Sequence, residues 1–360
     1  MFSFLIFIFI LSIMILVHEF GHFITARKLG IRVEKFSLGF GQKLLSYRKS
    51  STEYSLCLIP FGGYVKLAGD SWQECKGGKH EFLGRKISDR FKVIFAGPAL
   101  NYALAYLCFW MVNVVGYPNL TAKIGEVMQG YPAQEAGLLE DDTVISVDGN
   151  PVKYWQELQD IIRSKKAGQL DLEVLRNGDN ILLSVGLRRE GVKNIFGQEQ
   201  KVNIIGIRPK GETVVAKHNI AEGFILAGKN LWNLTTLTLG AIGRMFTGTV
   251  SLKESVTGPL GMFYITSEAV RLGLSAVLHL MAVLSASLAI FNLLPLPVLD
   301  GGHIFFLGLE KIRGRHLSQK AEENITKIGF GLIMALAVFV FLNDLERFGA
   351  LEWIMKIIKK

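Results

Sequence analysis

An apolar run that begins at Phe2 ends in the sequence His18-Glu19-Phe20-Gly21-His22. The run is about long enough to span a bilayer as one helix, which restricts the folds that the chain can adopt. Residues four apart on a helix share one face, so His18 and His22 can bind one Zn²⁺ together. Glu19 can then act as a general base on a water activated by the metal. Ionisable groups inside a membrane segment are costly, so these side chains are predicted to be functional.

The composition favours an integral membrane protein with one soluble insertion. Half of the 360 residues are hydrophobic, and the mean hydropathy of +0.33 is higher than is usual for a soluble protein of this size. The net charge of +9 does not indicate a nucleic-acid partner, because the basic residues flank apolar segments and do not form one stripe. The three cysteines form no C-x-x-C pair, which predicts free thiols.

Four apolar segments are candidates to span the membrane, at about 2–25, 93–116, 275–299 and 325–342. The first has no preceding Lys or Arg and no cleavage site after it, so we interpret it as an uncleaved helix and not as a signal peptide. Basic residues crowd the connections at 27–92 and 311–320, which predicts that both connections are cytoplasmic. Both termini and the segment between the second and third spans are then expected on the outer side.

A soluble module is predicted on the outer side from about Thr121 to Arg188. A Gly-rich segment at 130–138 precedes a short helix with one apolar face, and two alternating strands then flank the turn Asn177-Gly178. This order resembles the PDZ domains of bacterial membrane and envelope proteases. Asp141 stands where these modules commonly have glycine.

The stretch from about Ala216 to Arg271 has an apolar pattern that charged and amide residues interrupt. We expect either an amphipathic helix at the outer membrane surface or a plain linker helix there, and no fifth span. The chain therefore divides into a first membrane half at 1–116, a PDZ-like domain at 117–190, an outer amphipathic or linker region at 191–271 and a second membrane half at 272–360.

The third apolar segment ends in the motif Asn292-Leu-Leu-Pro295-Leu-Pro297-Val-Leu-Asp300. A catalytic zinc site typically has three protein ligands, and Asp300 stands at the cytoplasmic end of its segment, as the two histidines do. Pro295 and Pro297 cannot both belong to a regular helix, and broken helix at membrane depth is tolerated where it lines a cavity. Asn292 would offer a neutral donor to a substrate carbonyl. His303 is an alternative third ligand.

Taken together, these motifs resemble the site-2 protease family, specifically the bacterial RseP-type intramembrane metalloproteases. The segments 60–66 and 95–101 and the PDZ-like module add to the resemblance, which covers nearly the whole chain in order. It implies that His18, His22 and Asp300 bind zinc, that Glu19 is the catalytic acid and base, and that Asn292, Pro295 and Pro297 shape the substrate site. Some members carry two tandem PDZ domains, whereas the outer segment here has room for one.

The first cytoplasmic connection is predicted to contain a further element. The runs 54–59 and 61–67 have the pattern of two strands around a glycine turn. The resemblance implies a membrane-associated β-hairpin, and an edge strand there could pair with an extended substrate. A surface hairpin without substrate contact is the alternative.

The expected fold is a polytopic α-helical membrane protein with about four transmembrane helices, a membrane-associated β-hairpin and one inserted α+β PDZ-like domain. The resemblance implies a zinc-dependent endopeptidase that cleaves transmembrane segments of single-span proteins, such as anti-sigma factors or remnant signal peptides, in regulated intramembrane proteolysis. It also implies the bacterial inner membrane, with the PDZ-like domain in the periplasm and the active site near the cytoplasmic side.

The sequence favours this interpretation over three alternatives. A proteolytically inactive scaffold would be free to lose Glu19 and Asp300, which are both present. A transporter predicts inverted repeats between its halves, which the sequence does not show, and a tethered soluble zincin would carry its motif outside the span. The sequence does not identify the substrate, the upstream protease or the oligomeric state, nor whether the PDZ-like domain binds C-termini or acts as a size filter.

Overall fold

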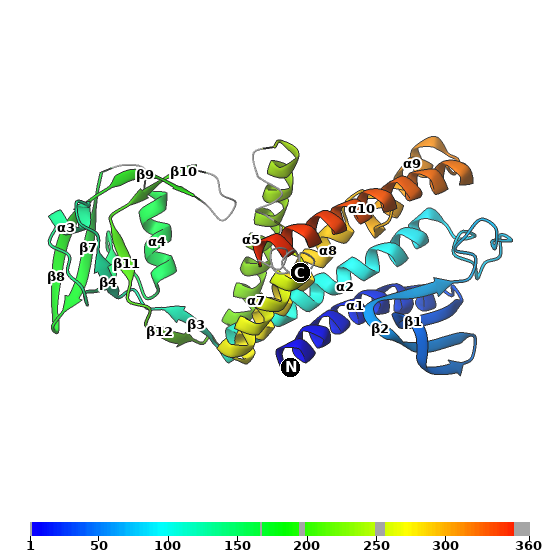
Figure 1. The fold of residues 1–360 in the computed structure, drawn as a ribbon, viewed down its shortest axis with the longest axis horizontal. Helices are drawn as coiled ribbons and strands as arrows, with labels where there is room; N and C mark the ends of the chain where they lie inside the picture. The colour runs from blue at the N-terminus through cyan, green and yellow to red at the C-terminus, as the bar shows by residue number, and fades with distance from the viewer. Residues whose placement is uncertain (1, 166–167, 194–198, 249–255, 349–360) are drawn as a thin grey trace, which may run out of the picture. The chain divides into compact units, whose positions relative to one another are not determined.

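The computed structural model describes residues 2–165, 168–193, 199–248 and 256–348. The chain divides into two compact units. The first comprises 1–112, 220–240 and 256–360, and the second comprises 113–219 and 241–255. The first unit is built mainly of long helices, and the second is a mixed α and β structure (Figure 1).

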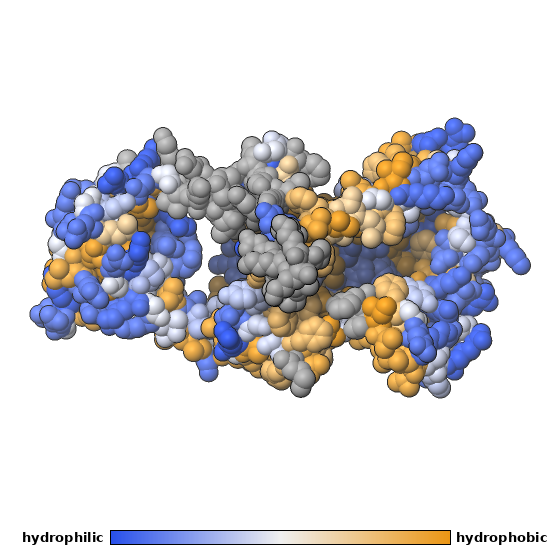
Figure 2. All heavy atoms as spheres, in the orientation of Figure 1, coloured by the Kyte–Doolittle hydropathy of each residue, from blue (hydrophilic) through white to orange (hydrophobic). Residues whose placement is uncertain are grey.

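Four helices among the described residues are long and apolar enough to cross a membrane. They are α1 (Phe2–Lys28), α2 (Ile87–Val115), α8 (Leu274–Asn292) and α10 (Gln319–Arg347). Three further helices are α5 (Ile220–Phe246), α7 (Pro259–Leu272) and α9 (Asp300–Arg313). Apolar side chains cover much of the helical part of the first unit in Figure 2, and hydrophilic residues gather at its end, near the turn between α9 and α10.

Small residues allow the helices of the first unit to approach closely. Ala105 of α2, Ala227 of α5 and Ala282 and Ala286 of α8 are fully buried in one apolar cluster. At the crossing of α1 and α2, a Cβ atom at Gly21 would lie 2.3 Å from the carbonyl oxygen of Ala96. Helices in membranes associate through such close contacts, because lipid provides no hydrophobic force between them.

The connection between α1 and α2 forms an antiparallel hairpin of β1 (Val33–Lys49) and β2 (Thr52–Leu67). One turn is at Ser50 and Ser51. The chain reverses again between 54–59 and 61–67, as predicted, because residues 53–56 run parallel to 35–38 and residues 63–66 run antiparallel to them. Both runs belong to β2, and they pair with opposite sides of the same four residues, 35–38 of β1. Gly62, with a φ of 128°, lies in the segment where the chain reverses between the two runs.

An apolar cluster attaches the hairpin to the helices. Phe23 and Ala26 of α1, Val33 and Leu67 of the hairpin and Val93 of α2 are buried together. The hairpin therefore lies beside the end of α1 that carries the histidines (Figure 1).

The third span ends earlier than the sequence analysis expected, at Asn292 and not at Leu299. Residues 293–299 form a turn that contains Pro295 and Pro297, as their fixed backbone geometry requires. The chain then re-enters a helix at Asp300. This helix, α9, was not expected, and its 14 residues are too few to span a bilayer.

The second unit contains a four-stranded antiparallel sheet in the order β6-β5-β7-β8, with α4 (Trp155–Ser164) packed on its core. Leu158 of α4, Leu170 and Leu172 of β7 and Val185 of β8 are fully buried. The remaining elements are α3 (Pro132–Glu135), β3 (Tyr117–Leu120), β4 (Ile124–Val127), β5 (Thr143–Val147), β6 (Asn150–Pro151), β7 (Gln169–Arg176), β8 (Asp179–Gly186), β9 (Arg188–Lys193), β10 (Glu199–Ile204), β11 (Ile207–Pro209) and β12 (Thr213–Ala216).

Strands β9 to β12 lie in the stretch that the sequence analysis interprets as the beginning of the outer linker region. β11 pairs with β4 and β12 pairs with β3. These pairings join residues 207–216 to the start of the unit, so the described strands of this unit extend beyond residue 190.

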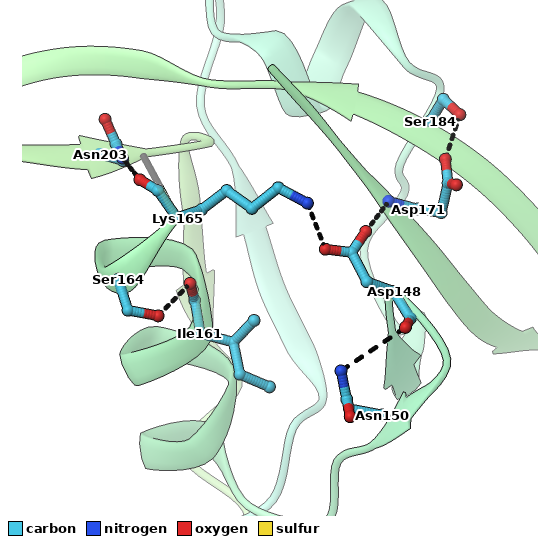
Figure 3. A network of polar contacts seen from close by, with 8 residues as sticks. All are labelled: Asp148, Asn150, Ile161, Ser164, Lys165, Asp171, Ser184 and Asn203. Atoms are coloured by element: carbon cyan, nitrogen blue, oxygen red, sulfur yellow. Dashed lines mark hydrogen bonds and ion pairs between the residues drawn. The ribbon is translucent and has the colours of Figure 1, made fainter. Parts of the chain in front are cut away.

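Polar contacts fix two loops of the second unit (Figure 3). The Lys165 ammonium donates to Asp148 Oδ2 at 2.5 Å, and the backbone N–H of Asp171 donates to Asp148 Oδ1 at 3.0 Å. Asn203 donates to the carbonyl oxygen of Lys165. Asp141, in the position where PDZ domains commonly have glycine, has a φ of 72°, and its carboxylate contacts Lys123 and Lys210. Asp141 therefore adopts a left-handed backbone conformation and forms ion pairs with two lysines.

Candidate active site

The last part of α1 presents two histidines on one face. His18 and His22 are one helical turn apart, and their Nε2 atoms are 3.2 Å from each other. The imidazole planes are nearly perpendicular, at 83°. Both lone pairs can therefore address one point, as the spacing predicted.

Asp300 reaches this point as the first residue of α9. The approach depends on two glycines, because a Cβ atom at Gly301 or at Gly302 would lie 2.2 Å from the carbonyl oxygen of Leu294 or of Leu296, respectively. Only residues without a side chain let α9 begin directly beneath the proline turn. The sequence Asp-Gly-Gly therefore positions the carboxylate.

The three side chains have the geometry of a metal site. Asp300 Oδ2 is 3.1 Å from His18 Nε2 and 3.5 Å from His22 Nε2. A tetrahedral zinc ion with ligands about 2.0–2.1 Å away keeps its ligand atoms about 3.3–3.4 Å apart. Asp300 Oδ2 is buried, and the described residues give it no hydrogen bond. These three residues are the group of potential metal ligands among the described residues, and they fit a zinc ion.

Glu19 lies beside this group and does not belong to it. Its Cγ atom would be 3.0 Å from a Cβ atom at Gly63, and the backbone of Val65 hydrogen-bonds to its carboxyl group. Strand β2 therefore positions the carboxylate, and glycine at residue 63 leaves room for it.

A cavity of about 520 Å³ connects these residues. Asn292, the last residue of α8, lines it together with Glu19, His303 and Tyr64. Pro295 and Pro297 are not among the described residues that line the cavity. Pro297 instead packs on α10, because its ring would be 3.0 Å from a Cβ atom at Gly329. The prolines shape the turn, and the asparagine faces the cavity.

Charged residues line another part of the cavity. Arg90 of α2 is paired with Glu310 of α9, and Glu310 also accepts from His316 Nδ1 at 2.9 Å. Trp72 donates to Glu322 Oε2 at 3.1 Å. These groups give this part of the cavity a polar lining in an otherwise apolar part of the molecule.

Comparison with known families identifies the chain. The family model described as peptidase family M50 matches residues 6–336. The chain belongs to peptidase family M50. This match confirms the resemblance to site-2 proteases.

The M50 peptidase has similar relatives along nearly its whole length. Zinc metalloprotease RasP of Oceanobacillus iheyensis is 28% identical, with 95% of this chain and 98% of the relative covered. The regulator of sigma-E protease RseP of Escherichia coli is also 28% identical, with the same coverage of 95% and 98%. A relative from Campylobacter jejuni is 32% identical, with 96% and 94% covered. The enzyme is therefore a metalloendopeptidase, and its cofactor is zinc.

Among solved structures, the M50 peptidase is similar to the PDZ domain of an SdrC-like protein from Listeria innocua. The identity is 26%, and the similarity covers 26% of this chain and 96% of that domain, with a TM-score of 0.21.

Sequence reasoning missed two residues of α2 that support the histidines of the M50 peptidase. His22 Nδ1 lies 2.8 Å from the carbonyl oxygen of Val93, which favours the proton on Nδ1 and a lone pair on Nε2. A Cβ atom at Gly97 would lie 2.3 Å from His22 Nε2 and 3.0 Å from His18 Cε1. A glycine inside an apolar helix was the available signal for such a close approach.

Proposed function

We propose that this M50 peptidase cleaves peptide bonds inside the transmembrane segments of single-span membrane proteins, in the inner membrane of a bacterium. One observation carries the proposal: His18, Glu19 and His22 belong to a helix that is long and apolar enough to span a membrane, and Asp300 meets them there. A protease that acts on soluble chains has no need for a motif within such a helix.

We assign the ligand role to His18, His22 and Asp300. The separations of 3.1 to 3.5 Å and the unpaired carboxylate oxygen support this assignment. When bound, zinc supplies a Lewis acid that polarises the scissile carbonyl group and lowers the pKa of the attacking water. Three protein ligands leave one position open for this chemistry.

Glu19 is the proposed acid and base. Its carboxylate takes a proton from the water as the water attacks the scissile carbonyl carbon, and it then gives a proton to the leaving amine. Asn292, at the end of α8, donates its side-chain N–H to the substrate carbonyl oxygen and stabilises the negative charge that develops there. Pro295 and Pro297 keep this end of the substrate site open by stopping the helix.

The hairpin is proposed to hold the substrate in an extended form. Residues 63–66 of β2 pair with β1 on one side, and Gly63, Tyr64 and Val65 line the cavity. A helical substrate hides its peptide bonds, so it must unwind before cleavage. Pairing with this strand would compensate the lost helical hydrogen bonds, and exposed apolar residues such as Leu44 and Leu45 would associate the hairpin with the membrane.

The basic connections that lead into α2 and α10 support a site near the cytoplasmic side, by the positive-inside rule. The second unit is then periplasmic, and we propose that its module at 117–190 is a PDZ-like domain that screens substrates. The name of the Escherichia coli relative, regulator of sigma-E protease, favours a substrate that controls a sigma factor.

The test compares the purified native chain with Glu19→Gln in detergent, using a model single-span substrate. We expect about one zinc ion per chain in both proteins, with cleavage by the native chain alone and loss of that cleavage on chelation. Glu74→Gln, a substitution in the exposed pair with Lys66, is the matched control and should cleave normally. Cleavage by Glu19→Gln would exclude the proposed base, and a native chain without zinc would overturn the site.

A further inference from the structure

Asn101 is a fully buried polar residue in the middle of α2, one helical turn after Gly97. Its backbone carbonyl oxygen accepts a hydrogen bond of 2.9 Å from Ser285 of α8. Its side chain turns toward α1 instead, where Nδ2 lies 3.4 Å from His18 Nδ1. A buried amide within a spanning helix is costly unless it is used, so this contact requires an explanation.

The ligand role of His18 determines which hydrogen bond is possible. Its Nε2 faces His22 Nε2 and Asp300 Oδ2, so Nε2 must carry a lone pair when the metal is bound. A neutral imidazole with a lone pair on Nε2 carries its proton on Nδ1. His18 Nδ1 is then a donor, and the atom opposite it must be an acceptor.

The amide of Asn101 can supply this acceptor. Rotation of the amide by 180° exchanges Nδ2 with Oδ1, and the two orientations have almost the same shape. Oδ1 has no hydrogen-bond partner among the described residues in its present orientation. The exchange therefore breaks no hydrogen bond of Oδ1, and the proton on His18 Nδ1 decides the orientation.

We infer that Asn101 is a positioning residue of the metal site, whose side-chain carbonyl accepts the Nδ1–H of His18. This hydrogen bond holds the tautomer whose Nε2 lone pair points at the metal position. The backbone carbonyl of Val93 does the same for His22 at 2.8 Å. Helix α2 thus provides an acceptor for each histidine, and Gly97 lies beside both rings. The inference rests on the ligand set of the proposed function.

The test measures zinc affinity of the full-length chain in detergent, by competition with a chelator. Asn101→Leu removes the acceptor at similar volume and should weaken zinc binding about 10–100-fold, as losses of such hydrogen bonds to metal ligands do. Asn101→Asp keeps an acceptor. It should therefore bind zinc at least as tightly as the native chain, unlike Asn101→Leu. Ser285→Ala removes the hydrogen bond to the Asn101 backbone alone and is the matched control, with unchanged affinity.

A second readout follows the proton itself. In the native chain, the Nδ1–H of His18 should be visible and slow to exchange in ¹⁵N-histidine NMR spectra, and in Asn101→Leu it should exchange faster. Native affinity in Asn101→Leu, or equal loss in the Leu and Asp variants, would overturn the inference while the proposed function stands. A native chain that binds no zinc would overturn both.

Discussion

Gly97 of α2 lies so close to His22 of α1 that a Cβ atom at residue 97 would be 2.3 Å from the imidazole Nε2. The same atom would be 3.0 Å from Cε1 of His18. The two imidazole rings of α1 can therefore keep these positions only because residue 97 of α2 has no side chain. The packing of α2 on α1 therefore restricts where both imidazole rings can lie.

Gly97→Ala is expected to weaken zinc binding about 10–100-fold, because the added methyl group displaces the imidazole of a ligand. Chelator competition on the purified chain measures the change. Gly331→Ala is the control, since Gly331 is also within a spanning helix and has open space around its Cβ position. Equal zinc affinity of Gly97→Ala and the native chain would show that the histidines do not need this approach.

A second prediction concerns Asp344, a carboxylate near the end of α10 that is 1% exposed. It accepts hydrogen bonds from the backbone N–H groups of Leu260 at 2.7 Å, Gly261 at 3.1 Å and Gly258 at 3.2 Å, at the start of α7. Asp344→Ala leaves these buried donors unpaired, so we expect a loss of about 1–3 kcal/mol in stability.

Thermal unfolding of the purified chain in detergent measures this loss. Glu268→Ala, which removes an exposed pair with Arg271, should change stability by less than about 0.5 kcal/mol. If the two substitutions have the same small effect, Asp344 does not hold the start of α7.

A third prediction follows from the second unit. The Lys165 ammonium, with a smaller contribution from the Asp171 N–H, holds the pKa of the Asp148 carboxyl below its ordinary value. A lowered pKa in the folded state stabilises the fold at pH values above the ordinary pKa, and this stabilisation is lost as the pH falls through the lowered pKa. Acid should therefore weaken the contact between the end of α4 and the loop at Asp148.

Carboxyl ¹³C NMR titration of Asp148 measures its pKa directly. We expect Lys165→Met to raise the titration midpoint toward the ordinary value and Lys153→Met to leave it unchanged, because Lys153 lies over the Tyr154 ring and not at Asp148. An unchanged midpoint in Lys165→Met would contradict the assigned cause.

The sequence was sufficient for the parts of the site that follow from local rules. The i, i+4 spacing of His18 and His22 needs only a helix to bring both rings to one face, and the two prolines before Asp300 require an interruption. The meeting of these two motifs could be expected from the ends of their apolar segments. The structure adds the helix α9, which short-range patterns did not reveal.

Elements that depend on contacts distant in sequence were not predictable in the same way. The glycine between the two strand-like runs predicted their reversal, but it did not predict that both runs pair with 35–38 of β1. The contact of Asn101 with His18 was not predictable, because the sequence does not say which side chain faces Asn101. The roles of Gly97 and Val93 likewise arise where α2 crosses α1.

The central claim is that the bond cleaved lies within an apolar segment. The most direct measurement is mass spectrometry of the products that the native chain makes from a single-span substrate in lipid vesicles. The account predicts fragments that end inside the apolar segment, and no such fragments from Glu19→Gln or after chelation. Fragments that end only in the flanking soluble residues would contradict it.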